Sequence, residues 1–379
     1  MIYADNAATT QISDLAFTKM LPFLREEYGN ASTQYSLGIK AKRAIEFARK
    51  QVADAIGSDP SEIIFTSGGS EGNSWVLQGI SILFEGEPIH IVTSSIEHYS
   101  VIKSCSALEK RGISVTYLPV NSNGFVSVSD IKSSLRSNTK LVSIMLANNE
   151  IGTIQPISEI GKLLRDLGIL FHTDAVQAIG HMPINVRDLE VDFMTASAHK
   201  FNGAKGTGFL YSRSGLALPP IIFGGNQEQG KRSGTENVAG FVALGYAIEE
   251  NVAGIEQSSS FVRKLIEITL EDIIKQIPDV YTNGDTFEKL PGIINLGFNG
   301  ISGEALMNLL DLKGICVSTS SACTSGENTP SHVLMALGLS ETQAKSAIRI
   351  SYSKYNTESE AKEVAAAICS GVKAIRRSK

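Results

Sequence analysis

The chain has 379 residues, of which 34 are lysine or arginine and 39 are aspartate or glutamate, so its formal net charge is -5. A chain this long normally divides into two domains, and its acidic balance without basic blocks argues against nucleic acid as a main partner. There is no uninterrupted apolar stretch of roughly eighteen residues and no secretory signal in residues 1–10, so we expect a cytoplasmic protein without a membrane partner.

The first two-thirds of the chain read as helices followed by alternating strands and helices. Helical periodicity covers residues 17–28 and 37–56. Apolar stretches typical of buried strands follow at 63–67, 90–95, 114–120, 140–147, 169–175, 193–198 and 206–211. Apolar strands separated by amphipathic helices predict an α/β fold with a mostly parallel sheet covered on both faces. Ligands of such sheets bind at the carboxyl ends of the strands.

A smaller α/β unit is expected after a polar break at residues 251–257. The expected elements are strands at 294–298 and 347–353, a helix at 303–312 and a final helix from Glu358. We therefore predict a large domain over residues 16–256, and a small domain formed by residues 1–15 and 257–379.

A lysine and an aspartate follow two of the predicted strands. Lys200 comes after the run at 193–198, and burial would lower the pKa of its ammonium group, which suits an amine that forms a Schiff base. A lone lysine at this place is more often a surface residue. Asp174 ends the strand at 169–175. Pyridoxal phosphate (PLP) needs a lysine at its aldehyde and a carboxylate at its ring nitrogen, so the pair indicates this cofactor.

Other polar groups also follow strands. Gly69 and Ser70 open a helix, where backbone N–H groups and a hydroxyl can hold an anion, although a capped turn fits equally well. His98 could stack on a planar cofactor or move a proton, or could be a solvent-exposed residue at a helix start. Asn149 could bond a ring oxygen or serve a turn.

The four cysteines differ in context. Cys105, Cys316 and Cys369 lie among apolar residues and are expected to be buried and reduced. Cys323 lies in a hydroxyl-rich stretch, 318–330, without a large apolar side chain, which predicts an exposed, mobile loop and a reactive thiol. Their spacing does not match a metal-ligand pattern, so we expect no metal site.

A cation is expected to bind substrate. Arg349 lies on the strand at 347–353, and its guanidinium could bind a carboxylate in two-pronged fashion, or it could be a surface cation on an edge strand. Asn30, in an early loop, is a second candidate for substrate binding. Arg232 could serve a phosphate or the substrate.

Seven segments together resemble the cysteine desulfurases of the class V aminotransferase superfamily. In chain order they are SGGSEGN at 67–73, EH at 97–98, NNEIG at 148–152, TDAVQ at 173–177, SAHK at 197–200, RSGTEN at 232–237 and SSACTSG at 320–326. The resemblance covers nearly the whole chain. It implies fold type I of the PLP-dependent transferases.

The resemblance also implies roles for individual residues. Lys200 would carry the cofactor and move the proton at the substrate Cα, Asp174 would keep the ring nitrogen protonated, and His98 would stack on the ring. Hydrogen bonds to the ring oxygen would come from Gln177 and Asn149. The phosphate would be held by Gly69, Ser70, Ser197 and His199, together with Thr235 of a neighbouring subunit, which implies a homodimer.

The implied reaction converts L-cysteine to L-alanine, with the sulfur held on Cys323 as a persulfide. A sulfur-acceptor protein would then receive it for iron-sulfur clusters, thio-cofactors or tRNA thiolation. Two alternatives remain open: a selenocysteine lyase or cysteine-sulfinate desulfinase, which would act without Cys323, and a slow-turnover sulfur-trafficking partner protein. The chain departs from the family pattern at Ala31, Tyr35, Asn226, Gln229, Thr329 and Ser353–Lys354, which concerns substrate and partner choice more than the cofactor.

Overall fold

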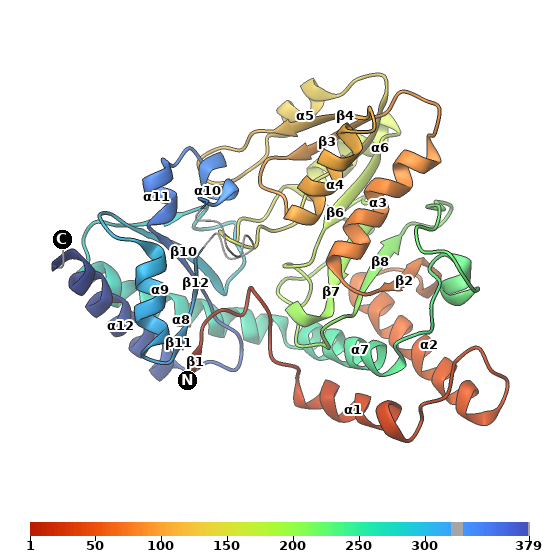
Figure 1. Cartoon of the computed structure of the whole chain (residues 1–379), viewed down its shortest axis with the longest axis horizontal. Helices are drawn as coiled ribbons and strands as arrows, with labels where there is room; N and C mark the ends of the chain where they lie inside the picture. Colours follow the sequence, from red (N-terminus) through yellow and green to blue (C-terminus); the bar gives the residue numbers. More distant parts are fainter. Residues whose placement is uncertain (320–328, 378–379) are drawn as a thin grey trace.

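The computed structural model describes residues 1–319 and 329–377, so the predicted nucleophile Cys323 lies outside the described residues. A seven-stranded sheet in the order β2-β8-β7-β6-β5-β3-β4 forms the larger part of the molecule (Figure 1). Only β8 runs antiparallel to its neighbours. The predicted α/β fold with a mostly parallel sheet is therefore confirmed. The strands are β2 (Ile63–Thr66), β3 (His90–Ser94), β4 (Ser114–Leu118), β5 (Thr139–Ser143), β6 (Leu170–Asp174), β7 (Phe193–Ser197) and β8 (Gly208–Ser212).

Helices cover both faces of this sheet. Phe209 of β8 packs into the core on one face, and its neighbour Leu210 packs with Trp75 in the core on the other, as expected of a strand that is buried on both sides. The covering helices are α1 (Asp14–Arg25), α2 (Ser36–Ile56), α3 (Gly69–Leu83), α4 (Tyr99–Glu109), α5 (Val128–Ser134), α6 (Ile157–Leu167) and α7 (Val238–Ala253). Short 3-10 turns lie at η1 (Pro60–Glu62), η2 (Ala198–Lys200) and η3 (Gln227–Gly230).

The smaller part is built on an antiparallel sheet, β12-β13-β10-β9, with a separate core. A second, two-stranded sheet pairs β1 (Ile2–Tyr3) in parallel with β11 (Ile315–Cys316), so the first strand of the chain packs in the smaller part. The remaining strands are β9 (Val280–Asn283), β10 (Ile293–Phe298), β12 (Ser318–Thr319) and β13 (Ala347–Ser351). The helices are α8 (Ile255–Gln276), α9 (Gly303–Asp311), α10 (His332–Ala336), α11 (Glu341–Lys345) and α12 (Glu358–Arg377).

Residues 5–10, the N-terminal segment, connect the two parts (Figure 1). At its start, Asp5 bridges Ser351 of β13, and the amide of Asn6 donates to the Ser351 carbonyl over 3.1 Å. At its end, the amide of Thr10 donates to the carbonyl of His199 over 2.8 Å. The segment therefore runs from the small sheet to the turn that follows β7.

The strand predicted over residues 140–147 ends earlier, at Ser143. Beyond this residue, Ile144 and Leu146 still donate to β6 carbonyls, but the amide of Met145 donates to the side chain of Glu97 over 3.0 Å. At Met145, the Glu97 side chain thus accepts the hydrogen bond that a backbone carbonyl of a neighbouring strand would accept in a continued β5. The pattern of apolar residues cannot reveal such an exchange of partners.

The prediction that three cysteines are buried holds for two of them. Cys105 and Cys369 are buried, and burial raises the pKa of the Cys105 thiol to about 12. Cys316 is only half-buried, so this prediction was wrong. It lies on β11 opposite Tyr3, in a two-stranded sheet that has no further strand to cover it.

Two further features concern membranes and metals. Within residues 1–319 and 329–377, no single helix is long and apolar enough to cross a membrane, and α7 with α8 reaches such a composition only as a pair bent by 74°. The same residues contain no group of three or more His, Cys, Asp or Glu side chains that could hold a metal ion.

A buried ion pair ties α2 to the turn η3. The guanidinium of Arg49 donates to both carboxylate oxygens of Glu228 over 2.7 and 2.8 Å, and the amide of Phe65 donates to the same carboxylate over 2.8 Å. Glu228 keeps this position with a backbone φ of 46°, a left-handed value that non-glycine residues rarely adopt.

We predict that Glu228→Gln lowers the free energy of unfolding by about 3 kcal/mol, because it leaves a buried guanidinium without its counter-charge. Asp54→Asn is the matched control, since the Asp54–Lys50 pair is exposed on the same helix, and its loss should change stability by less than about 0.5 kcal/mol. Urea denaturation measures both. Equal stability of the two variants would contradict the assigned role of the buried pair.

Candidate active site

A cavity of about 320 Å³ opens between the large sheet and the small sheet. Its walls include the turns that follow β6 and β7, the start of α3 and one side chain from β13. Most of the predicted site residues line it, namely Gly69, Ser70, His98, Asn149, Asp174, Gln177, Ser197, His199, Lys200 and Arg349. Groups far apart in the sequence therefore share one cavity.

The amine of Lys200 is held by the backbone of the N-terminal segment. Its Nζ donates to the carbonyl of Ala7 over 2.5 Å and to that of Ala8 over 2.9 Å. The Ala7 carbonyl also accepts from Nε2 of Gln177 over 2.9 Å. Both alanines line the cavity, so backbone carbonyls fix where the amine stands.

Asp174 presents a nearly buried carboxylate to the cavity. One oxygen accepts from the amide of Val176 over 2.9 Å, and the other accepts from Nδ2 of Asn73 over 2.6 Å. Nδ2 of Asn73 also donates to the hydroxyl of Ser100 over 2.8 Å, which contacts Nδ1 of His98 at 2.8 Å. A continuous chain of hydrogen bonds thus connects Asp174 to the imidazole.

His98 is the N-cap of α4. Its Nδ1 accepts from the amide of Ser100 over 3.1 Å, which places the proton of the neutral ring on Nε2. Burial lowers the pKa of His98, the charge of Lys200 lowers it further, and the charge of Asp174 opposes the shift. A neutral imidazole therefore faces the cavity.

One end of the cavity is suited to an anion. α3 begins there with Gly69 and Ser70, and its first backbone N–H groups have no partner within the helix. A Cβ added at Gly69 would stand 2.6 Å from Cγ2 of Val176, so a larger residue would force Val176, which lines the cavity, to move. His199 contacts Oγ1 of Thr9 at 3.1 Å, and burial together with the nearby charges of Lys200 and Lys205 lowers the pKa of its ring to about 4.

Arg232 has a partner of its own. Its Nε donates to Glu71 over 2.9 Å and its NH2 donates to the other oxygen of the same carboxylate over 3.2 Å. Glu71 also accepts from the amide of Ser67 over 2.8 Å, just before α3. Arg232 thus stabilises the start of α3 and is not among the described residues that line the cavity. A role for it in binding phosphate or substrate stays a prediction.

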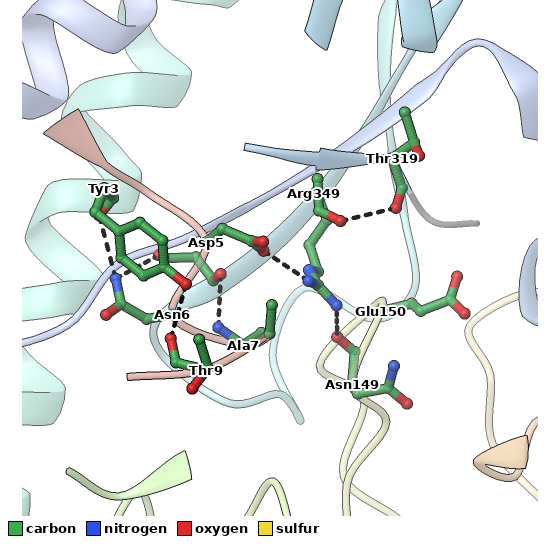
Figure 2. A network of polar contacts seen from close by, with 12 residues as sticks. Tyr3, Asp5, Asn6, Ala7, Thr9, Asn149, Glu150, Thr319 and Arg349 are labelled. Atoms are coloured by element: carbon green, nitrogen blue, oxygen red, sulfur yellow. Dashed lines mark hydrogen bonds and ion pairs between the residues drawn. The ribbon is translucent and has the colours of Figure 1, made fainter. Parts of the chain in front are cut away.

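Arg349 is buried and lines the cavity. Figure 2 shows its guanidinium between the carboxylate of Asp5 and the carbonyl of Asn149. NH2 donates to Asp5 over 2.6 Å and NH1 donates to Asn149 over 2.9 Å, whereas Nε has no hydrogen-bond partner among the described residues. The reading of Arg349 as a surface cation is therefore wrong.

Two predicted residues do not line the cavity, and a third is not among the described residues. Asn30 and Thr235 are exposed and do not line it within the described chain, and Cys323 lies outside the described residues. The side-chain oxygen of Asn30 accepts instead from the amide of Ser32 over 2.9 Å.

Two functional groups were missed by the sequence interpretation. Asn73 follows Gly69 by one helical turn, so their shared helix face could have revealed it. Glu97 gives no such signal, because its role depends on burial. It is fully buried, accepts from Ser94 over 2.6 Å, and burial raises its pKa to about 8, with the charge of Asp174 adding to the shift.

Comparisons with known proteins agree on one family. The pattern of the family described as Aminotransferase class-V matches residues 2–364. The chain is 46% identical to "Cysteine desulfurase IscS" of Methanosarcina thermophila over 96% of this chain and 90% of that protein. A solved structure called "NIFS-LIKE PROTEIN" superposes with a TM-score of 0.93 at 38% identity, covering 98% of this chain and 99% of that one. Another, "SspA in complex with cysteine", gives a TM-score of 0.84 at 36% identity, covering 94% and 100%.

The buried acid Glu97 leads to a prediction on pH. Its pKa is about 8 in the folded chain against an ordinary 4.5, so its contribution to stability is present below pH 4.5 and is lost as the pH rises through 8. Glu97→Gln mimics the protonated acid. We expect the stability of the wild type to fall relative to this variant between pH 5 and 8, by at most roughly 1.4 kcal/mol per pH unit.

Urea denaturation at several pH values measures the difference. Glu363→Gln, on an exposed position of α12, is the control and should follow the wild type throughout. If the difference in free energy of unfolding between the wild type and Glu97→Gln stays constant with pH, Glu97 does not keep its proton over this range.

Proposed function

The chain belongs to the class-V aminotransferase family, and we propose that it is a PLP-dependent cysteine desulfurase. The observation that carries the proposal is a single cavity that holds the amine of Lys200, the carboxylate of Asp174 and the guanidinium of Arg349. These are the groups needed for a carbonyl cofactor and an amino-acid substrate. The structural relative solved with cysteine supports L-cysteine as that substrate.

The residues of the cavity fit PLP. Asp174 offers a nearly buried carboxylate to the ring nitrogen, His98 offers a neutral ring for stacking, and the start of α3 offers N–H groups to the phosphate. Glycine at 69 lets the start of α3 approach Val176 closely. When bound, PLP withdraws electrons and makes the Cα proton of an amino acid acidic.

The remaining steps belong to this chain. Arg349 binds the substrate carboxylate, and the amine of Lys200 removes and returns the proton at Cα. The thiolate of Cys323 attacks the substrate sulfur, so the Sγ–Sγ bond forms while the Cβ–Sγ bond breaks and Cβ takes a proton. The products are L-alanine and a persulfide on Cys323. Formation of the S–S bond is the oxidation, and conversion of the substrate Cβ to a methyl group is the matching reduction.

The outer sulfur of the persulfide is then transferred to a thiol of an acceptor protein. Transfer leaves Cys323 reduced and ready for the next cysteine, so no external oxidant is needed. The outer sulfur of a persulfide is electrophilic, and an acceptor thiolate attacks it as in thiol–disulfide exchange. The iron-sulfur or thiolation pathway served by this sulfur depends on the acceptor.

We also propose that the enzyme is a homodimer that associates through α1 and α2. Large apolar side chains are exposed along these helices and the loop between them, including Phe17 at 47% and Leu24 at 58% on α1 and Tyr28 at 71% in the loop. Several exposed large apolar side chains on neighbouring elements are typical of a protein interface. A second subunit would also bring its Thr235, which is exposed here, toward the anion-binding end of the cavity.

The activity is tested by measuring alanine and persulfide formed from L-cysteine. The wild type should form both, whereas Cys323→Ser and Lys200→Ala should each lose at least about a hundredfold in rate because each removes a group that bonds to a reacting partner. Cys316→Ser is the matched control and should keep the wild-type rate, since its thiol lies on β11.

Full activity of Cys323→Ser toward L-cysteine would contradict the proposed sulfur transfer. Activity of that variant only with L-selenocysteine or cysteine sulfinate would instead identify a lyase or desulfinase, because those leaving groups need no attacking thiol.

The dimer is tested by paired charge substitutions. Phe17→Asp with Leu24→Asp should convert the dimer to monomer in analytical ultracentrifugation, because two carboxylates would be buried in an apolar interface. Leu312→Asp is the control, since Leu312 is 84% exposed beyond α9 in the small part and should leave the dimer intact. Unchanged sedimentation of the double variant would place the interface elsewhere.

A further inference from the structure

Arg349 is a buried cation whose ion-pair partner lies outside the cavity. Only 4% of Arg349 is exposed, and its one ion pair in the described chain is the 2.6 Å contact between NH2 and Asp5. Asp5 is not among the described residues that line the cavity. The guanidinium is therefore held by Asp5 and Asn149 while Arg349 still lines the cavity, which is the condition for binding a second carboxylate.

The position of Asp5 is set by backbone contacts rather than by the ion pair. Its neighbours are fixed to β13: the amide of Ser351 donates to the carbonyl of Ala4 over 2.8 Å, and the amide of Asn6 donates to the carbonyl of Ser351 over 3.1 Å. Asp5 bridges Ser351, two residues from Arg349 on the same face of the strand. The Asp5 carboxylate thus has a fixed position, and its contact with NH2 orients the longer side chain of Arg349.

The second fixed point is the carbonyl of Asn149, which accepts from NH1 over 2.9 Å. Two acceptors on different elements define the plane of the guanidinium (Figure 2). Neutralisation by Asp5 avoids the cost of an unpaired buried charge, but it also weakens the attraction between Arg349 and a second anion. Orientation and charge therefore act in opposite directions on substrate binding.

We propose that Asp5 is a positioning residue that sets the affinity of Arg349 for the substrate carboxylate. Its hydrogen bond orients the guanidinium, and its negative charge moderates the attraction so that the carboxylate of the product can leave. This inference rests on the proposed function, because Arg349 acts there as the clamp for the amino-acid carboxylate.

Two substitutions separate the two effects. Asp5→Asn keeps an oxygen that accepts from NH2 and removes the charge, so Arg349 remains oriented and attracts carboxylates more strongly. Asp5→Ala removes the acceptor as well, so the guanidinium loses a fixed point. Asp279→Asn is the control, since it makes the same change in an exposed pair with Arg376.

The measurement is the dissociation constant of 3-mercaptopropionate, a carboxylate that lacks the reacting amine, on the cofactor-loaded protein by isothermal titration calorimetry. Asp5→Asn should bind it roughly three- to tenfold more tightly than the wild type, and Asp5→Ala more weakly than Asp5→Asn. The neutral amide 3-mercaptopropionamide should bind all variants equally. With L-cysteine, the KM of Asp5→Asn should fall.

Unchanged or weaker binding of 3-mercaptopropionate by Asp5→Asn, or an equal change for the neutral amide, would overturn the proposal. Thermal unfolding of each free variant shows whether it is folded before the comparison is made. A wild type that forms no alanine from L-cysteine would refute the proposed function, whereas the binding comparison would still decide the role of Asp5.

Discussion

The attachment of residues 5–10 to both sheets is the constraint on which the site depends. The Ala7 and Ala8 carbonyls hold the amine of Lys200, and Asp5, two residues earlier, holds the guanidinium of Arg349. These two cations come from different sheets and are separated by almost 150 residues of chain. A short segment with a turn at residues 6–8 therefore sets the spacing between the amine and the carboxylate clamp.

Burial determines the protonation of the groups around the cavity. Burial raises the pKa of the Glu97 carboxyl to about 8, and together with nearby positive charge it lowers that of the His199 ring to about 4. Both groups are thereby kept neutral near pH 7, while Asp174 and Arg349 are each matched by hydrogen bonds. The charges that face a ligand are thus few, and each of them has a fixed position.

Much of the site could be predicted because it follows a simple rule of parallel sheets. Asp174 and Lys200 come after adjacent strands, so a polar residue at the end of each apolar run was sufficient to place them together. The antiparallel direction of β8 and the partner of Arg232 could not be predicted, since both depend on contacts between distant segments. The carbonyls of Ala7 and Ala8 carry no side-chain signal at all. The roles of Asn30, Thr235 and Cys323 remain predictions.

The course of the chain has a consequence for how this enzyme can vary. The carbonyls that hold the amine of Lys200 do not come from the large sheet, because they belong to the N-terminal segment, which follows β1, and β1 pairs with β11 of the small part. A hybrid that joins the large part of one relative to the small part of another can take Lys200 from one protein and the carbonyls of residues 7 and 8 from the other. The amine and the carbonyls that hold it would then not have evolved together. Recombination within the family must therefore preserve the contacts of the first ten residues both with Lys200 and with the small part.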